Sequence, residues 1–143
     1  MTRIEFQVDG IPKGQPRPRA FVRGGHAAVY DPGTAEGWKS AIAQAVQPHR
    51  PEQPLTGALD VTIDFHMPRP KSHYRTGKHA GELKSSAPRW HIGKPDIDNL
   101  LKACLDALTA LHVWFDDAQI AALTATKEYS DRPGAVIIVE TLI

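Results

Sequence analysis

The pattern of polar and apolar residues along four segments of this chain predicts four strands. The alternation is strict over residues 3–9 and 59–65, which indicates strands with one buried face each. It continues over residues 118–129, and residues 135–143 are rich in β-branched side chains, which favours two more strands. Residues 20–30 are typical of a hairpin, with two short apolar runs on either side of a Gly-Gly turn.

Two further segments repeat their apolar residues at helical spacing. The first is expected over residues 35–47, with Thr34 as the candidate N-cap, and the second over residues 97–111. The predicted buried stripe of the first helix is Trp38, Ala41, Ile42, Ala45 and Val46. The predicted stripe of the second is Leu101, Cys104, Leu105, Leu108 and Leu111. Adjacent strands with two interspersed helices predict one α+β domain over residues 1–143, in which the helices pack on a mixed sheet.

Two segments lack any such periodicity. Residues 12–19 contain three prolines and several cations, which predicts an extended basic arm. Residues 67–94 are rich in proline and glycine, and a connection of this length is usually functional or disordered. We therefore expect residues 70–93 to form a basic, mobile loop that orders on contact with a ligand.

Charge is strongly segregated, although the formal net charge is only +1. Residues 66–94 hold seven Lys and Arg against a single acid, Glu82, whereas residues 95–143 hold three Lys and Arg against eight acids. A basic segment that leads into an acidic one suits a protein that binds a polyanion and presents metal ligands to it. A solvated basic loop is the alternative interpretation of the first segment.

The composition also excludes some classes of protein. No apolar run reaches the length of roughly 18 to 20 residues that a membrane span needs. The N-terminal residues lack the apolar core of a signal peptide, and the single cysteine, Cys104, cannot form an internal disulfide. We therefore expect a cytoplasmic protein.

Carboxylates gather around the second predicted helix. Asp96 and Asp98 stand at its start, Lys102 lies four residues beyond Asp98, and Asp116 and Asp117 follow its end. Such oxygen ligands suit a hard divalent cation, which can activate water and neutralise charge on a phosphodiester. Each acid alone also has a structural interpretation, because aspartate is favoured at helix N-caps and in turns. A straight helix would hold the two pairs about 20 Å apart, and the spacing does not settle whether they meet.

The segment from Gly93 to Ile120 resembles the RusA family of Holliday-junction resolvases. The resemblance rests on the motifs D-x-D-N-L-x-K from Asp96, D-A-L from Asp106 and W-x-D-D-x-Q from Trp114, and on a later Lys127. It implies an α+β homodimer that binds four-way DNA junctions and uses Mg²⁺ or Mn²⁺. It also implies catalytic, metal-binding aspartates at Asp96, Asp98 and Asp117 and an essential lysine at Lys102, with Asp116 ranked lower.

These inferences together predict a Mg²⁺-dependent endonuclease that resolves junctions by symmetric paired nicks in DNA recombination and repair. Lys102 would contact the scissile phosphate or orient the nucleophile. Contacts with the DNA backbone would come from cations in both basic segments. The candidates are Arg17, Arg19, Lys71, Arg75, Lys78, Arg89 and Lys94.

Two other functions remain open from the sequence. One is a non-catalytic protein that binds branched DNA, and the other is a metal-dependent nuclease of broader specificity for flaps or forks. A zinc site is not favoured, because there is no paired-cysteine spacing and no H-E-x-x-H motif. Four histidines lie within residues 66–94, where we interpret them as solvated loop residues.

Overall fold

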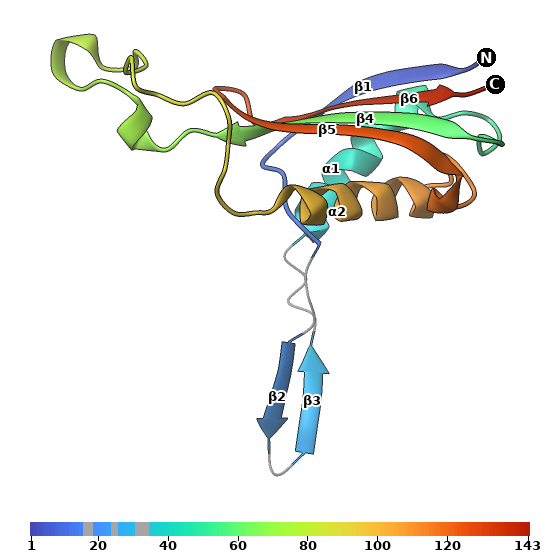
Figure 1. Ribbon diagram of the computed structural model, residues 1–143. Helices are drawn as coiled ribbons and strands as arrows, with labels where there is room; N and C mark the ends of the chain where they lie inside the picture. The colour runs from blue at the N-terminus through green and yellow to red at the C-terminus, as the bar shows by residue number, and fades with distance from the viewer. Residues whose placement is uncertain (16–18, 24–25, 31–34) are drawn as a thin grey trace.

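A four-stranded mixed sheet with both main helices on one face forms the body of the protein (Figure 1). The computed structural model describes residues 1–15, 19–23, 26–30 and 35–143, and the side chains of residues 19–30 are not part of that description. The strands of the sheet are β1 (Arg3–Asp9), β4 (Leu59–Pro68), β5 (Ile120–Ser130) and β6 (Gly134–Thr141). The helices are α1 (Glu36–Val46) and α2 (Ile97–Ala110). The predicted α+β class is therefore confirmed.

The strand order β1-β6-β4-β5 makes β4 an interior strand and β5 an edge. β4 pairs antiparallel with β6 and parallel with β5, so the sheet is mixed as predicted. Every second residue of β4 is buried, and these residues belong to one core with the apolar faces of both helices. The intervening residues, among them Asp64 and His66, project from the half-exposed opposite face.

Each helix packs on the sheet through its apolar face. In α1 the stripe of Trp38, Ile42 and Val46 is buried as predicted. In α2 the predicted Cys104 and Leu108 are buried, and the other three predicted residues are partly buried against the core. The buried face also includes Leu100, Ala103 and Ala107, which the predicted stripe left out. Alanines on that face let the helix approach α1 and the sheet closely. In the part of the chain that the structure describes, no helix is long and apolar enough to cross a membrane.

Two segments lie outside this body. β2 (Arg19–Arg23) and β3 (His26–Tyr30) pair antiparallel as a separate two-stranded ribbon, which confirms the predicted hairpin. The predicted Gly-Gly turn, the N-cap at Thr34 and the phosphate contact at Arg17 fall outside the described residues.

The connection after β4 projects beyond the end of the sheet as an arm, residues 69–90 (Figure 1). It contains two 3₁₀ turns, η2 (Lys71–His73) and η3 (Gly77–His79), and a bridge between Tyr74 and Leu83 closes it on itself. At its base, Arg69 donates to the carbonyl oxygen of Pro88 at 2.7 Å. The loop expected here is thus present and internally hydrogen-bonded, and its mobility stays a prediction.

The close approach of β6 to β1 can be tested by a substitution at Gly134. A Cβ at this position would lie 2.1 Å from the carbonyl oxygen of Val8, so backbone would have to move. We expect Gly134→Ala to lower the free energy of unfolding by about 1–3 kcal/mol, measured by urea denaturation.

Gly37→Ala is the matched control, because nothing lies within 4 Å of a Cβ there and alanine favours a helix. It should be neutral or stabilising. Equal stability of the two variants would contradict this account of β6.

Candidate active site

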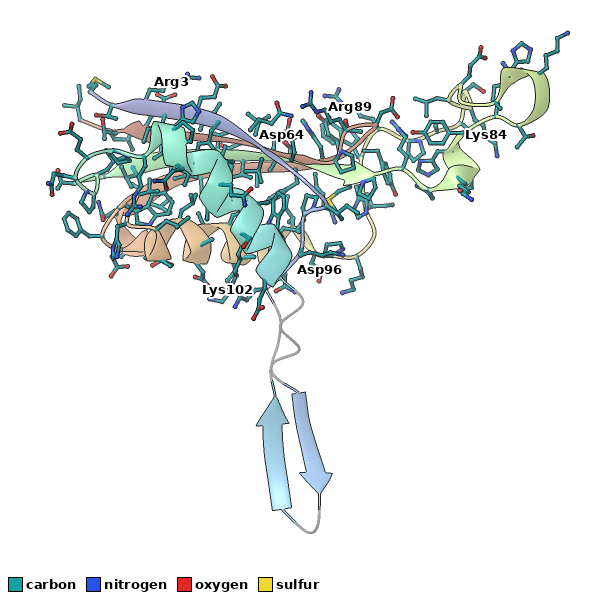
Figure 2. The ribbon with its side chains drawn as sticks, turned by 180° about the vertical axis from the view of Figure 1, so that it is seen from behind. Arg3, Asp64, Lys84, Arg89, Asp96 and Lys102 are labelled. Atoms are coloured by element: carbon teal, nitrogen blue, oxygen red, sulfur yellow. The ribbon has the colours of Figure 1, made fainter. Side chains whose placement is uncertain are left out.

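Asp96 and Asp98 occupy the first turn of α2, on the helix side of the molecule (Figure 2). Asp96 is the N-cap residue, but its carboxylate makes no capping hydrogen bond and instead pairs with Lys94 at 3.0 Å. Asp98 accepts only the local N–H of Asn99 among the contacts described, at 2.9 Å. Because the capping role is not taken up by Asp96, its carboxylate remains available to a cation.

Lys127 holds the turn that carries Asp96. Its Nζ donates to the carbonyl oxygens of Gly93 and Pro95 at 2.7 and 2.8 Å, which ties this turn to β5. Partial burial lowers the pKa of Lys127, and the nearby charge of Asp96 opposes that effect. Sequence reasoning did not include Lys127 among the site residues, although its place in the motif was a usable signal.

Lys102 lies on the exposed face of α2 between the two acidic groups. Its Nζ is 3.6 Å from Asp106, and 63% of its side chain is exposed. At the far end, Asp117 begins the short 3₁₀ turn η4 (Asp117–Gln119). A hydrogen bond with Asp116 raises the pKa of Asp117, with further increases from Asp116 and Asp106, while Lys102 lowers it. Lys102 is therefore within electrostatic range of Asp117.

Asp116 has a structural task that Asp117 lacks. Its carboxylate accepts the N–H of Ala118 at 2.9 Å and closes a capping box with Gln119. This hydrogen bond lowers the pKa of Asp116. Gln119 also donates to the carbonyl oxygens of Leu55 and Gly57, so this motif residue fixes the fold locally. Asp117 is consequently the freer ligand of the two.

The structure does not bring the three predicted ligands together in one chain. Asp96, Asp98 and Asp117 do not form a group whose ligand atoms lie within 4.8 Å of one another. Asp98 and Asp106 alone are eight residues apart on the helix, a rise of about 12 Å. One ion bound at the start of α2 therefore cannot also reach Asp117 of the same chain.

Most of the predicted DNA contacts lie along the arm and its root. Lys71, Arg75 and Lys78 are exposed on the arm, where Arg75 pairs with Glu82 at 3.2 Å. Arg89 at the root pairs with Glu128 and lies over the ring of Trp90. For Arg19 the structure describes the β2 backbone alone.

A cleft of about 400 Å³ adjoins the Asp96 turn. It is lined by residues 11–14, by the end of β4 and by His91, Lys94 and Pro95. Lys13 and Lys94 supply positive charge beside apolar walls, which suits the backbone and sugar of a nucleic-acid strand.

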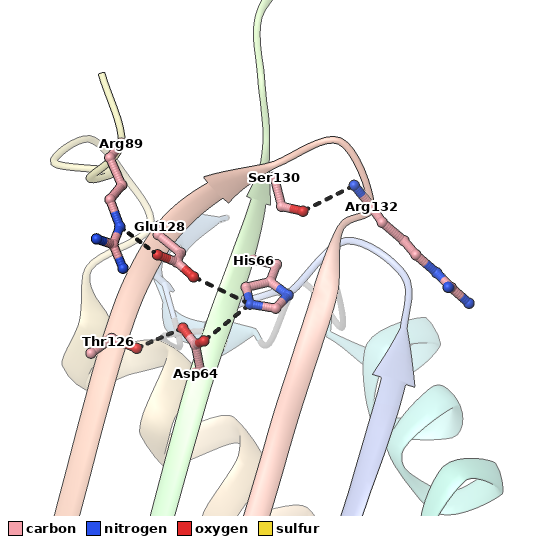
Figure 3. A network of polar contacts seen from close by, with 7 residues as sticks. All are labelled: Asp64, His66, Arg89, Thr126, Glu128, Ser130 and Arg132. Carbon is pink, nitrogen blue, oxygen red and sulfur yellow. Dashed lines mark hydrogen bonds and ion pairs between the residues drawn. The ribbon is translucent and has the colours of Figure 1, made fainter. Parts of the chain in front are cut away.

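A second polar cluster lies on the opposite face of the sheet (Figures 2 and 3). His66 Nε2 is 3.1 Å from Asp64 and 3.5 Å from Glu128, and the side chains are only 20–35% exposed. Among the described residues, these three form the one group of three or more potential metal ligands whose atoms lie within 4.8 Å of one another. The interpretation of His66 as a solvated loop residue was wrong, because β4 extends through it.

His91 also departs from that interpretation. Burial lowers its pKa, with a smaller effect of Lys127 in the same direction, and its ring packs edge-on against Tyr129. The backbone N–H of His91 donates to the carbonyl oxygen of Lys127 at 3.0 Å. His91 thus helps attach the arm to the edge of β5.

Comparison with known proteins assigns the fold and the motifs to a family. The model of endodeoxyribonuclease RusA matches residues 9–140, nearly the whole chain. The chain belongs to the RusA family. It is also 33% identical over 139 residues to the uncharacterized protein YqaN of Bacillus subtilis (strain 168), an alignment that covers 97% of this chain and 96% of that protein.

Membership places this protein among the endodeoxyribonucleases. The residues of the RusA motifs have distinct structural roles in the fold. Asp96, Asp98 and Asp117 each interact with a residue within two positions along the chain, whereas Asp116, Gln119 and Lys127 hold turns.

Lys127→Met should weaken the turn that carries Asp96. It removes two charge-assisted hydrogen bonds but keeps the aliphatic stem, so the free energy of unfolding should fall by about 1–3 kcal/mol. Hydrogen exchange should also accelerate at the amides of residues 96–98.

Lys78→Met is the control, since Lys78 is an exposed residue of the arm. Its effect should stay within about 0.5 kcal/mol. Equal effects of the two substitutions would show that Lys127 does not anchor the turn.

Proposed function

We propose that this RusA-family protein is a Mg²⁺- or Mn²⁺-dependent endonuclease that binds four-way DNA junctions and resolves them by paired symmetric nicks. The observation that carries the proposal is the pair of carboxylates at the start of α2 in a chain of an endodeoxyribonuclease family. Asp96 and Asp98 supply them, and the Asp96 carboxylate is not used to cap the helix. Cleavage of this kind serves DNA recombination and repair.

The donor set fits the implied metal. Carboxylate oxygens are the ligands that Mg²⁺ and Mn²⁺ prefer, and Asp96 and Asp98 offer them on one helical turn that Lys127 holds in place. A bound ion supplies an activated water and neutralises charge on the phosphodiester. Lys102 lies one helical turn beyond Asp98, where it would offer a compact cation to a non-bridging phosphate oxygen.

Asp117 would complete the site from a second subunit. In one chain it lies too far from the start of α2, so we propose that a two-fold dimer brings Asp117 of the partner subunit beside Asp96 and Asp98. Two such sites related by a two-fold axis would also match the symmetry of a four-way junction.

The edge of β5 is the proposed dimer interface. Residues 121–124 are exposed on this edge strand, and 44% of Leu123 is accessible. The end of the strand beyond them is already covered by residues 89–91 of the arm root. A second copy of the free segment could pair there in antiparallel fashion, which satisfies edge N–H and C=O groups.

Charge and register favour that arrangement. In an antiparallel pairing centred on Ala122, residue 120 of one strand stands opposite residue 124 of the other, which directs η4 of one chain toward the far end of β5 in its partner. The acidic residues just before one strand, Asp116 and Asp117, would then approach the basic end of the partner strand, where Lys94 and Lys127 lie beside Asp96. Each encounter occurs twice, so the interface is complementary to itself.

DNA backbone contacts would come from the arm and from the hairpin side. Lys71, Arg75 and Lys78 project with the arm, and Arg89 and Lys94 flank its root. Arg17 and Arg19 belong to the basic segment that leads into β2. Such contacts give affinity without reading sequence. Selectivity for junctions over flaps, forks and duplexes is tested by comparing cleavage of synthetic four-way, three-way and linear DNA with Mg²⁺ or Mn²⁺.

Asp98→Asn should reduce junction cleavage by about 100-fold or more, because it removes a charge that holds the ion. Junction affinity in a gel-shift assay should be retained, since an acid near the phosphate has been neutralised. Asp9→Asn, on the far edge strand, should cleave normally. Near-normal cleavage by the Asp98 variant would show that Asp98 is not a metal ligand. If the wild type binds junctions but does not cleave them, a non-catalytic role would be favoured.

Leu123→Glu should convert a dimer into a monomer, because it places like charges across the proposed two-fold interface. Light scattering coupled to gel filtration should report half the wild-type mass, and cleavage should be lost together with the dimer. Leu142→Glu is the control, since Leu142 is similarly exposed, at 42%, near the C-terminus. A Leu123→Glu protein that remains dimeric would exclude the β5 edge as the interface.

A further inference from the structure

We infer that Asp64, His66 and Glu128 form a second cation site, selective for Zn²⁺-type ions and distinct from the proposed nuclease site. The two sites lie on opposite faces of β5, because the side chains of Lys127 and Glu128 alternate across the sheet. Lys127 holds the Asp96 turn on one face, and Glu128 joins the second cluster on the other (Figures 2 and 3).

The backbone prearranges the three side chains. Asp64 and His66 are two residues apart on β4 and project from the same face, and His66 is directly in register with Glu128 on β5. Paired strands are among the most rigid supports a protein offers, so little ordering entropy remains to oppose binding of an ion.

The distances suit a Zn²⁺ coordination shell. Ligands at about 2.0–2.2 Å from a tetrahedral Zn²⁺ stand roughly 3.4 Å apart. His66 Nε2 lies 3.1 Å from Asp64 Oδ2 and 3.5 Å from Glu128 Oε1. An imidazole nitrogen with two carboxylates favours Zn²⁺ or a similar transition ion over Mg²⁺, and a water would take the fourth position.

The outer oxygens of both carboxylates are held independently of His66 (Figure 3). Thr126 Oγ1 donates to Asp64 Oδ1 at 2.6 Å, and Arg89 Nε donates to Glu128 Oε2 at 3.1 Å. Each carboxylate thus turns one oxygen to the cluster while an outer partner orients the other, the arrangement that supports ligands in metal sites. Arg89 need not leave when an ion binds.

An ion here would stiffen the root of the arm. Arg89 and His91 both attach the arm to β5 at residues 127–129, next to Glu128. Fixing Glu128 against β4 would therefore fix the point from which the basic arm projects. The inference does not depend on the proposed nuclease activity.

The test is metal binding by the full-length protein after dialysis against EDTA. Calorimetric titration with Zn²⁺ should give binding that His66→Gln and Glu128→Gln each weaken at least tenfold. Thr126→Val, which removes only the outer hydrogen bond to Asp64, should weaken it by about 10- to 100-fold. Zn²⁺ should raise the melting temperature of the wild type, and Mg²⁺ should not compete at equal concentration.

Two controls separate this site from other binding. His79 pairs with Glu82 on the arm at 3.5 Å but with no third ligand, so His79→Gln should bind Zn²⁺ normally. Asp98→Asn should also bind Zn²⁺ normally even though the nuclease proposal predicts loss of cleavage. Circular dichroism and melting without metal establish that each variant is folded.

Three results would contradict the proposed Zn²⁺ site. If the wild type binds no Zn²⁺, the cluster is only a set of polar contacts between the two strands, and the inference is wrong. If folded His66→Gln binds Zn²⁺ as tightly as the wild type, the ion sits elsewhere. A loss of binding in Asp98→Asn alone would assign the Zn²⁺ to the start of α2.

Discussion

The parallel pairing of β4 with β5 is the constraint on which the rest of the molecule depends. Parallel neighbours cannot be joined by a tight turn and require a long crossover from one end of the sheet to the other. Here the crossover includes the arm, the Asp96 turn, α2 and η4. Every residue with a proposed role in catalysis lies on this one connection, and residues 127–129 of β5 fasten it near the Asp96 turn.

β5 holds the connection through side chains on both faces of the sheet and through the backbone groups of its outer edge. Lys127 reaches to the helix side and holds the carbonyl oxygens before Asp96, while Glu128 reaches to the other side and pairs with Arg89 of the arm. The backbone groups of Lys127 and Tyr129 meanwhile pair with residues 89–91. One short stretch of strand therefore positions the carboxylates, the arm and the second cluster together.

The separation of Asp98 from Asp117 follows from the same crossover. A 14-residue helix must traverse the sheet before the chain can enter β5, so acids placed before and after it lie at its two ends. Under the proposed function, this geometry would leave a single chain with an incomplete metal site and would give a dimer a chemical reason beyond symmetry. The exposed edge of β5 lies between the two acid groups, where a second copy could join them.

The sequence by itself determined the α+β class, the positions of most elements and the Asp96, Asp98 and Lys102 motif, because these depend on local periodicity and on residue type. It also placed Cys104 correctly in the core. Only the tertiary structure decided the register that brings His66 beside Glu128, the capture of the Asp96 turn by Lys127, and the face of α2 that is buried. The first two of these join residues that are 62 and 32 positions apart. Periodicity carries no information about which strands become neighbours.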